Sequence, residues 1–195
     1  GLPVDDNDRA KLVNALSVKA GYEEAWDYYT SFRPNVHRSN SRDAEFTFQS
    51  ATRTLFDWRT SEDARLSAVI LGTGGDGMLD FAVPPTIGGT LLSQAQLLPP
   101  GTYHLKGKSG RIDQPSRSQP YWTLRCRDGR ELGRVPIPNS DKHNGLFQGK
   151  ITVPQNCPEQ TLSLIARATD SITGVLGQID RAALVPAELE KASVK

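Results

Sequence analysis

The sequence predicts a mainly β protein, an antiparallel jelly-roll β-sandwich preceded by a short α-helical hairpin. Helical periodicity is confined to the first part of the chain, up to about residue 33. After it come about nine or ten short segments with two-residue alternation, separated by turns rich in glycine and proline. Strands at this spacing, with no helices between them, are typical of two packed antiparallel sheets. We therefore expect a helical hairpin and linker in residues 1–40, the sandwich in 41–188 and a tail in 189–195.

Residues 5–34 carry the signals of two helices. The first has aspartates where the helix dipole favours them, apolar residues at helical spacing and a glycine at its end. These residues are Asp5, Asp6 and Asp8, then Leu12, Val13 and Leu16, and finally Gly21. The second helix ends before Pro34 and gathers its apolar residues on one face. That face consists of Tyr22, Ala25, Trp26 and Tyr29.

The run Gly21-Tyr22-Glu23-Glu24-Ala25, with Tyr29 and Pro34 after it, resembles the second half of a tetratricopeptide repeat. A single half-repeat cannot bury its apolar face by itself. Either the hairpin packs on the domain that follows it, or it belongs to a longer array of repeats. The sequence leaves both alternatives open, and we favour the array.

The expected strands alternate apolar and polar residues. They cover residues 46–48, 66–70, 78–81, 91–98, 103–108, 121–126, 131–135, 147–153, 161–168 and 178–185. Pro99-Pro100-Gly101, with Gly101 in a left-handed conformation, and Arg127-Asp128-Gly129-Arg130 are turn sequences that we expect to close β-hairpins. The glycine-rich residues 72–77 lead into a strand and lack a Lys-Ser/Thr pair. They therefore predict another hairpin turn rather than a phosphate-binding loop.

Alternation also assigns side chains to faces of the sheets. In residues 121–126 it places Trp122, Leu124 and Cys126 in the core. The outward residues are then Tyr121, Thr123 and Arg125 in this strand, and His104, Lys106 and Lys108 in residues 103–108.

Composition excludes several classes of function. Lys and Arg number 23 against 22 Asp and Glu, so the formal charge of +1 creates no field that would attract nucleic acid. The apolar runs stop well short of the roughly 18 residues that a membrane span needs. We find no Gly-x-Ser-x-Gly and no His-Glu-x-x-His motif, and we expect no catalytic activity. A hydrolase would require loop carboxylates to converge, from among Asp57, Asp76, Asp113, Asp141 and Asp180.

Cys126 and Cys157 are the two cysteines of the chain. In an oxidising compartment they could close a disulfide, and the alternative is two unrelated buried thiols. A zinc site is disfavoured because neither residue belongs to a Cys-x-x-Cys motif and the histidines lie far from both in sequence. We expect the disulfide, no metal and no cofactor.

Residues 46–186 contain a further set of motifs. They are Phe56-Asp57-Trp58-Arg59, Leu97-Leu98-Pro99-Pro100-Gly101-Thr102-Tyr103-His104-Leu105-Lys106-Gly107, Trp122-Thr123-Leu124-Arg125-Cys126, Val153-Pro154 with Cys157-Pro158, and Ile179-Asp180-Arg181-Ala182-Ala183-Leu184. This set resembles the galactose-binding-like jelly-roll modules of the carbohydrate-binding kind, the last domain of some exported bacterial proteins. The resemblance implies a glycan-binding module in the periplasm, in the cell envelope or outside the cell.

The chain departs from this family where many members hold a structural calcium. Gln49 stands in place of an acidic residue, and Asp180 is followed by Arg181 rather than by a second aspartate. Calcium takes about 6–8 oxygen ligands. Only Asp180 can be assigned as a ligand, so we expect no calcium site.

Sugar recognition needs an exposed aromatic ring with hydrogen-bonding side chains around it. The candidates are Tyr121, His104, Arg125, His143 and Asp141, and a purely structural role stays open for each. Residues 106–134 hold eight basic and three acidic residues, a net charge of +5. If Arg125 and Lys106 lie on adjacent strands, they favour an acidic polysaccharide; the alternative is that both are solvated.

Two functions follow from these observations. The first is a non-catalytic module that binds a glycan or exopolysaccharide of the bacterial envelope. The alternative is a protein-interaction or structural domain, with a partner bound through the N-terminal helices. Exposed apolar surface around Trp26 and Tyr29 would favour the alternative.

Overall fold

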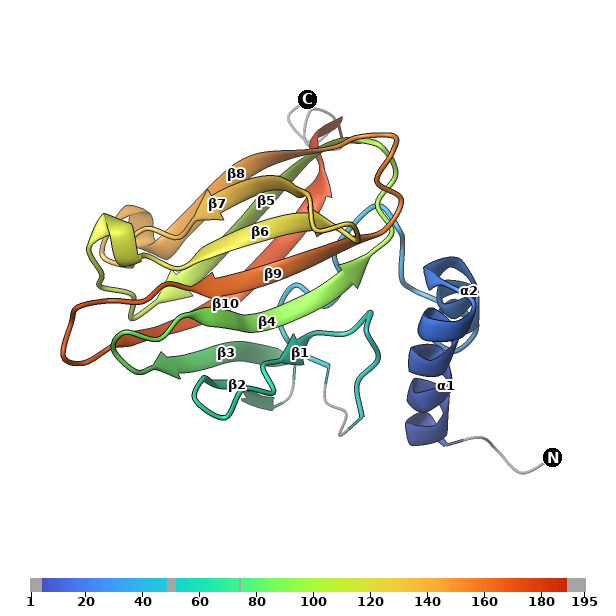
Figure 1. Ribbon diagram of the computed structural model, residues 1–195, viewed down its shortest axis with the longest axis horizontal. Helices are drawn as coiled ribbons and strands as arrows, with labels where there is room; N and C mark the ends of the chain where they lie inside the picture. The colour runs from blue at the N-terminus through green and yellow to red at the C-terminus, as the bar shows by residue number, and fades with distance from the viewer. Residues whose placement is uncertain (1–4, 49–51, 74, 189–195) are drawn as a thin grey trace.

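The chain folds into two five-stranded antiparallel sheets that face each other, with two helices beside them (Figure 1). The computed structural model describes residues 5–48, 52–73 and 75–188. The sheet nearer the viewer in Figure 1, called the front sheet, has the strand order β1-β4-β9-β6-β7. The back sheet has the order β2-β3-β10-β5-β8. The predicted fold class is confirmed.

The elements have the following bounds. The helices are α1 (Asp6–Lys19) and α2 (Tyr22–Phe32). The front sheet contains β1 (Arg59–Thr60), β4 (Gly89–Gln96), β6 (Tyr121–Cys126), β7 (Glu131–Pro136) and β9 (Gln160–Ala166). The back sheet contains β2 (Ser67–Thr73), β3 (Asp76–Val83), β5 (Gly101–Gly110), β8 (Leu146–Val153) and β10 (Val175–Pro186). Two short 3-10 turns, η1 (Ser116–Ser118) and η2 (His143–Gly145), precede β6 and β8.

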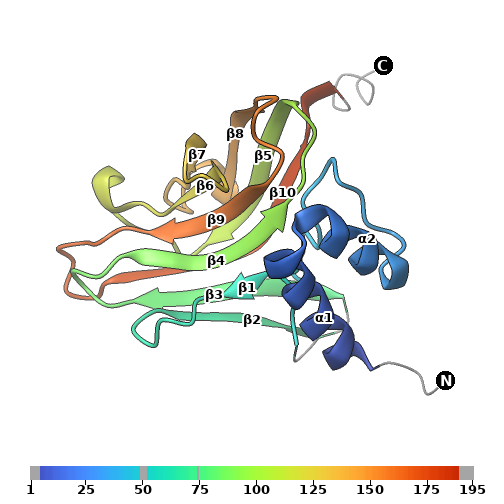
Figure 2. The same cartoon turned by 45° about the vertical axis from the view of Figure 1, so that its right-hand side comes forward.

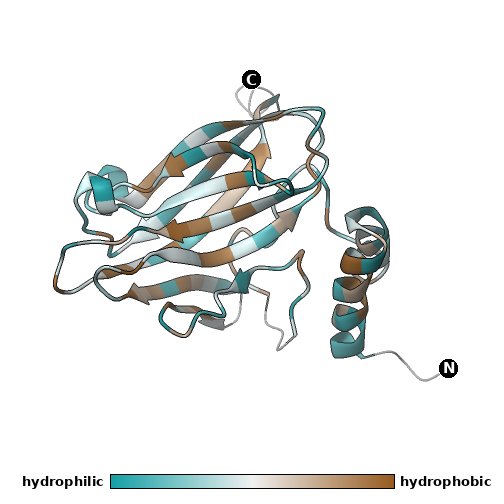
Figure 3. Ribbon diagram, viewed as in Figure 1, coloured by the Kyte–Doolittle hydropathy of each residue, from teal (hydrophilic) through white to brown (hydrophobic). Residues whose placement is uncertain are grey.

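Alternating residues of the two sheets fill the core between them. Figure 3 shows the alternation as apolar and polar bands along the strands. Trp58 and Trp122 are fully buried, and their ring centroids lie 5.5 Å apart. Leu124 and Cys126 are buried on the same side of β6 as Trp122. The faces assigned to residues 121–126 are therefore confirmed for the inward set.

Two of the three expected hairpin turns are confirmed. Residues 127–130 join β6 to β7, which pair with each other, and Gly129 has a φ of 88° that favours glycine. β2 and β3 also pair, up to the bridge between Thr73 and Asp76.

The prediction for Pro99-Pro100-Gly101 is wrong. This turn carries the chain from β4 in the front sheet to β5 in the back sheet, and Gly101 is not among the glycines with positive φ. The Tyr103 hydroxyl donates to the carbonyl of Pro99 at 2.7 Å across the turn. A turn motif predicts that the chain reverses, but it does not say which sheet the next strand joins.

The strand expected at 46–48 is also absent from the described residues. Phe46 has a φ of 54°, and its N–H donates to the carbonyl of Asp43 at 3.2 Å. The Asp43 carboxylate accepts the backbone N–H of Thr47 at 2.7 Å and that of Phe48 at 3.1 Å. Phe46 belongs to a turn, and its ring packs on Trp58 with centroids 5.7 Å apart. The apolar residue that suggested a strand therefore serves the core from a turn.

The helical hairpin packs on the sandwich (Figure 2). Its apolar face meets Phe56, Ala95 and Leu97. Trp26 and Tyr29 are only 4% and 2% exposed. Of the two alternatives for the hairpin, the structure shows packing on the following domain; the array of repeats stays a prediction.

Arg42 lies inside this junction. Its Nε donates to the carbonyl of Phe56 at 2.9 Å, and its Nη2 donates to the carbonyl of Ala95. Its guanidinium carbon is 5.2 Å from the Trp26 ring centroid. Burial lowers the pKa of Arg42 to about 10, so the side chain remains charged at neutral pH. A single buried cation thus joins the helices to the sandwich.

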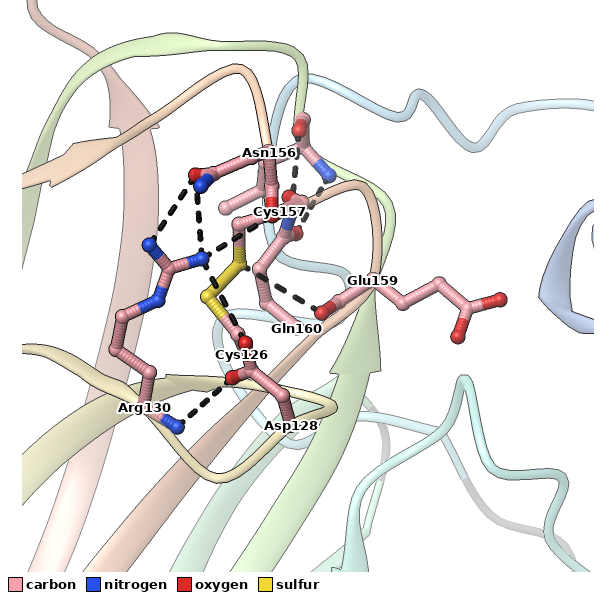
Figure 4. The surroundings of a disulfide bond; sticks show 8 residues. Cys126, Asp128, Arg130, Asn156, Cys157, Glu159 and Gln160 are labelled. Carbon is pink, nitrogen blue, oxygen red and sulfur yellow. Dashed lines mark hydrogen bonds and ion pairs between the residues drawn. A yellow bond between two sulfur atoms is a disulfide. The ribbon is translucent and has the colours of Figure 1, made fainter.

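Cys126 and Cys157 form the expected disulfide, with Cα atoms 5.6 Å apart (Figure 4). The bond ties the end of β6 to the loop before β9, where Arg130 also donates to Asn156 at 3.2 Å. Disulfides persist in oxidising compartments such as the periplasm or the cell exterior. None of the helices within the described ranges is long and apolar enough to cross a bilayer. Gln49 and the expected tail, 189–195, lie outside the described residues.

Candidate functional site

The predicted binding residues do not form one site. Tyr121 and Arg125 lie on β6 of the front sheet, whereas His104 lies on β5 of the back sheet. Asp141 and His143 lie in the segment before β8. The condition that Arg125 and Lys106 lie on adjacent strands is not met, because β6 and β5 belong to different sheets.

The outer face of the front sheet is closed by its own side chains around Tyr121. The ring is only 8% exposed. The guanidinium carbons of Arg134 and Arg167 lie 4.8 and 4.6 Å from its centroid. Cation–π contacts of this kind already use the ring surface that a sugar would need.

Arg125 belongs to a paired network on the same face. Its Nη2 donates to Glu131 at 3.1 Å, and Glu131 also accepts from Arg134 at 2.5 Å. The hydrogen bond from Arg134, followed by that from Arg125, holds the pKa of Glu131 below its ordinary value. The carboxylate therefore stays ionised and neutralises part of the local positive charge.

A groove of about 660 Å³ lies on the outer face of the back sheet, over β5, β8 and β10. We call it the back-sheet groove. Its lining consists of Lys106, Gly107, Lys108, His143, Leu146, Phe147, Gln148, Asp180 and Arg181. His143 is thus the predicted residue that the structure places here, and His104 lies two residues before Lys106 on β5.

A β-bulge in β10 builds one wall of this groove. The pairing of β10 with β5 shifts register between Ile179 and Arg181. Ile179 and Ala182 are both fully buried, whereas Arg181 between them is exposed and Asp180 is partly exposed. Two consecutive polar side chains therefore both lie away from the core, whereas successive side chains of a regular strand point to opposite faces.

The strand opposite the bulge needs a glycine. A Cβ at Gly107 would lie 2.0 Å from the carbonyl oxygen of Arg181 and 2.4 Å from Cζ of Phe147. Both distances are far below contact, so a side chain would displace the bulge. Gly107 thus fixes the position of Arg181 at the groove.

The 3-10 turn η2 brings His143 to the groove. His143 and Asn144 have φ values of 51° and 54°, followed by Gly145 with a φ of 75°. The Gly145 N–H donates to the carbonyl of Lys142 at 2.9 Å, and the Ser109 hydroxyl donates to the carbonyl of Gly145 at 3.2 Å. These contacts hold the turn against β5, while Asp141 is exposed in the preceding loop.

The charges of the groove are mainly positive. Among the described lining residues, Lys106, Lys108 and Arg181 are cationic and Asp180 carries a carboxylate. Lys108 Nζ lies 3.5 Å from Asp180 Oδ2. The structure thus offers cations, an amide from Gln148 and an imidazole from His143 around a partly apolar floor. Within the described ranges we find no group of three side chains that could hold a metal ion.

Sequence reasoning missed Asp180, Arg181 and Gln148 as lining residues. Alternation could have assigned Gln148 to the outward face of β8, together with Leu146. No local signal marks the bulge that exposes Arg181, because the bulge is defined by pairing with β5.

No family model matches this chain, and no curated protein matches it. Among solved structures, a CBM4 structure is 14% identical, with 78% of this chain and 99% of that chain covered and a TM-score of 0.47. The CBM6cm-2 module of Cellvibrio mixtus lichenase 5A is 10% identical over 68% of this chain and 98% of its own, with a TM-score of 0.37. The Gap123 complex of Streptococcus agalactiae is 14% identical over 66% of this chain, with a TM-score of 0.42, and this chain spans 41% of its length. An arabinose-bound MgGH51 α-L-arabinofuranosidase is 14% identical over 76% of this chain, with a TM-score of 0.48, and this chain spans 26% of its length.

Proposed function

We propose that this chain is a non-catalytic glycan-binding module of an exported bacterial protein and that the back-sheet groove binds the sugar. One observation carries the proposal, namely the open hollow of about 660 Å³ that is lined by both polar and apolar residues. Small-ligand sites combine an apolar surface with a few placed polar groups, and a pyranose has both an apolar face and hydroxyl edges.

The groove offers both kinds of surface. Leu146 supplies apolar surface, because this lining residue is 57% exposed. Gln148 and His143 can exchange hydrogen bonds with sugar hydroxyls, and Asp180 can accept them. Within the part of the chain that the structure describes, no second carboxylate lines this groove, whereas glycoside hydrolysis ordinarily needs two.

Three further observations bear on this proposal and on the protein-interaction alternative. The motifs described above resemble carbohydrate-binding modules, and the disulfide suits an oxidising compartment such as the periplasm. The alternative relied on exposed apolar surface around Trp26 and Tyr29. Both side chains are buried against the sandwich, and the exposed large apolar residues of the described hairpin are Leu12 and Val18 of α1.

The test is retention of the whole chain on a panel of immobilised neutral and acidic polysaccharides. Gln148→Ala and His143→Ala should each weaken binding by about 2- to 12-fold, the loss of one hydrogen bond. Tyr121→Ala and Arg125→Ala should leave it unchanged. Weakening by the second pair alone would move the site to the front sheet, and binding to no polysaccharide of the panel would reject the proposal.

A further inference from the structure

Positive charge extends beyond the groove along the outer face of the back sheet. His104 pairs with Lys150, Lys106 with Gln148, and Lys108 with Leu146 across β5 and β8. Arg181 of β10 pairs with Lys108 on the other side of β5. Lysines two residues apart on one strand point to the same face and lie roughly 7 Å apart. The face therefore carries four cationic side chains on neighbouring strands, Lys106, Lys108, Lys150 and Arg181.

Two cations of this face are not neutralised by the described residues. Many arginines elsewhere lie beside carboxylates, as in Arg117 with Asp170 and Arg127 with Glu159, both at 2.6 Å. In contrast, Arg181 and Lys150 are exposed and form neither an ion pair nor a side-chain hydrogen bond with any described residue. The chain as a whole has a formal charge of only +1. Arg181 at the groove and Lys150 beside it on β8 can thus meet an anionic ligand without first breaking an ion pair.

We infer that the back-sheet groove selects polysaccharides that bear anionic groups, a conclusion that rests on the proposed glycan binding. Arg181 and Lys150 hold the anionic groups, while the exposed Leu146 lies under a sugar ring. A guanidinium binds carboxylate and sulfate oxygens through paired N–H donors. Asp180 opposes the anion and is itself held by Lys108.

The first test compares polymers that differ only in charge. Polygalacturonate should bind, and its methyl ester, in which each carboxylate is neutralised, should bind about tenfold more weakly or not at all. Raising the salt from about 50 mM to about 0.5 M should weaken binding of the acid form because exposed charges are screened. A second comparison, of dextran sulfate with dextran, measures the effect of sulfate groups. The larger of the two affinity differences identifies sulfate or carboxylate as the preferred group.

The second test uses variants of single charges. Arg181→Gln and Lys150→Gln should each lower affinity for polygalacturonate by about two- to fivefold. Asp180→Asn should raise it by a similar factor, because the variant removes the carboxylate that repels the ligand. The matched control is Arg117→Gln, which removes an exposed arginine outside the groove and should leave affinity unchanged.

The outcomes separate the two claims. Equal binding of the acid and ester forms, without a salt effect, would overturn the charge preference and leave glycan binding in place. An equal loss in Arg117→Gln and Arg181→Gln would also overturn it, because bulk charge and not the groove would then be responsible. Binding to neither form nor to any neutral polymer would reject the proposed function itself.

Discussion

The carboxylate of Glu159 accepts the backbone N–H of Tyr22 at 3.2 Å, although 137 residues separate them. Tyr22 is the first residue of α2, and the N-cap residue Gly21 has no side chain to cap the helix. The other oxygen of Glu159 accepts from Arg127 at 2.6 Å, and Arg127 lies 5.2 Å from the Tyr22 ring centroid. The sandwich therefore caps the second helix, and a negative charge suits a helix N-terminus.

Removing this cap should destabilise the helical hairpin. We expect Glu159→Ala to lower the free energy of unfolding by about 1 kcal/mol, the usual effect of losing a cap, and Glu159→Gln to lower it less because an acceptor oxygen remains. Denaturant unfolding measures the loss, and amide hydrogen exchange should rise at the start of α2. Glu62→Ala, a change at a carboxylate that is 89% exposed, serves as the control. If both variants lose equal stability, the cap contributes nothing.

Reduction of the disulfide should lower stability without abolishing the fold. Cys126 and Cys157 are 31 residues apart, and a loop of that length corresponds to about 3–4 kcal/mol in the chain-entropy relation. The sheet should survive because Cys126 also lies opposite Gln160 in the pairing of β6 with β9. The measurement is the unfolding midpoint with and without reductant. The double variant Cys126→Ala/Cys157→Ala should have the same unfolding midpoint as the reduced protein, and reductant should not change that midpoint. An unchanged midpoint on reduction of the parent chain would contradict the prediction.

The sequence predicted those parts of the fold that depend on local periodicity. Burial of Trp122 and Leu124 follows from two-residue alternation, and the aspartate cap of α1 is encoded next to the helix, where Asp5 accepts the N–H of Asp8 at 2.7 Å. The hairpin at Gly129 is likewise local, since its turn sequence lies between its own two strands.

The parts that were not predictable depend on pairing between distant segments. The change of sheet after β4 is decided by which strands β5 meets, and it separates Arg125 from Lys106. One of the two guanidinium groups that lie over the Tyr121 ring belongs to Arg167, which directly follows β9 and is distant from Tyr121 in sequence. The bulge that exposes Arg181 exists only in the pairing of β10 with β5. The groove therefore contains His143 from the predicted set and several residues that no local motif marked.

Arg42 should be essential for docking of the helices. We expect Arg42→Met to lower the free energy of unfolding by about 1–3 kcal/mol, because the carbonyls of Phe56 and Ala95 lose their buried donor while the apolar volume is roughly kept. Denaturant unfolding provides the value. Arg65→Met, a change at a side chain that is 68% exposed, should be nearly neutral. A neutral Arg42→Met would show that the buried guanidinium does not stabilise the junction.

Gly107 links stability to the shape of the back-sheet groove. In Gly107→Ala the added methyl group must displace either the carbonyl of Arg181, 2.0 Å from its position, or the ring of Phe147. Overpacking of this kind costs about 1–3 kcal/mol, and we expect that loss in denaturant unfolding. Because the displaced carbonyl belongs to the bulge, the folded variant should also retain less polygalacturonate than the parent chain.

Gly101→Ala is the matched control, since its Cβ would meet nothing nearer than 3.8 Å and its strand is the same β5. An unchanged free energy of unfolding in Gly107→Ala would mean that the bulge can shift without destabilising the fold. The expected loss of stability, with unchanged retention on polygalacturonate, would mean that the position of Arg181 does not govern binding.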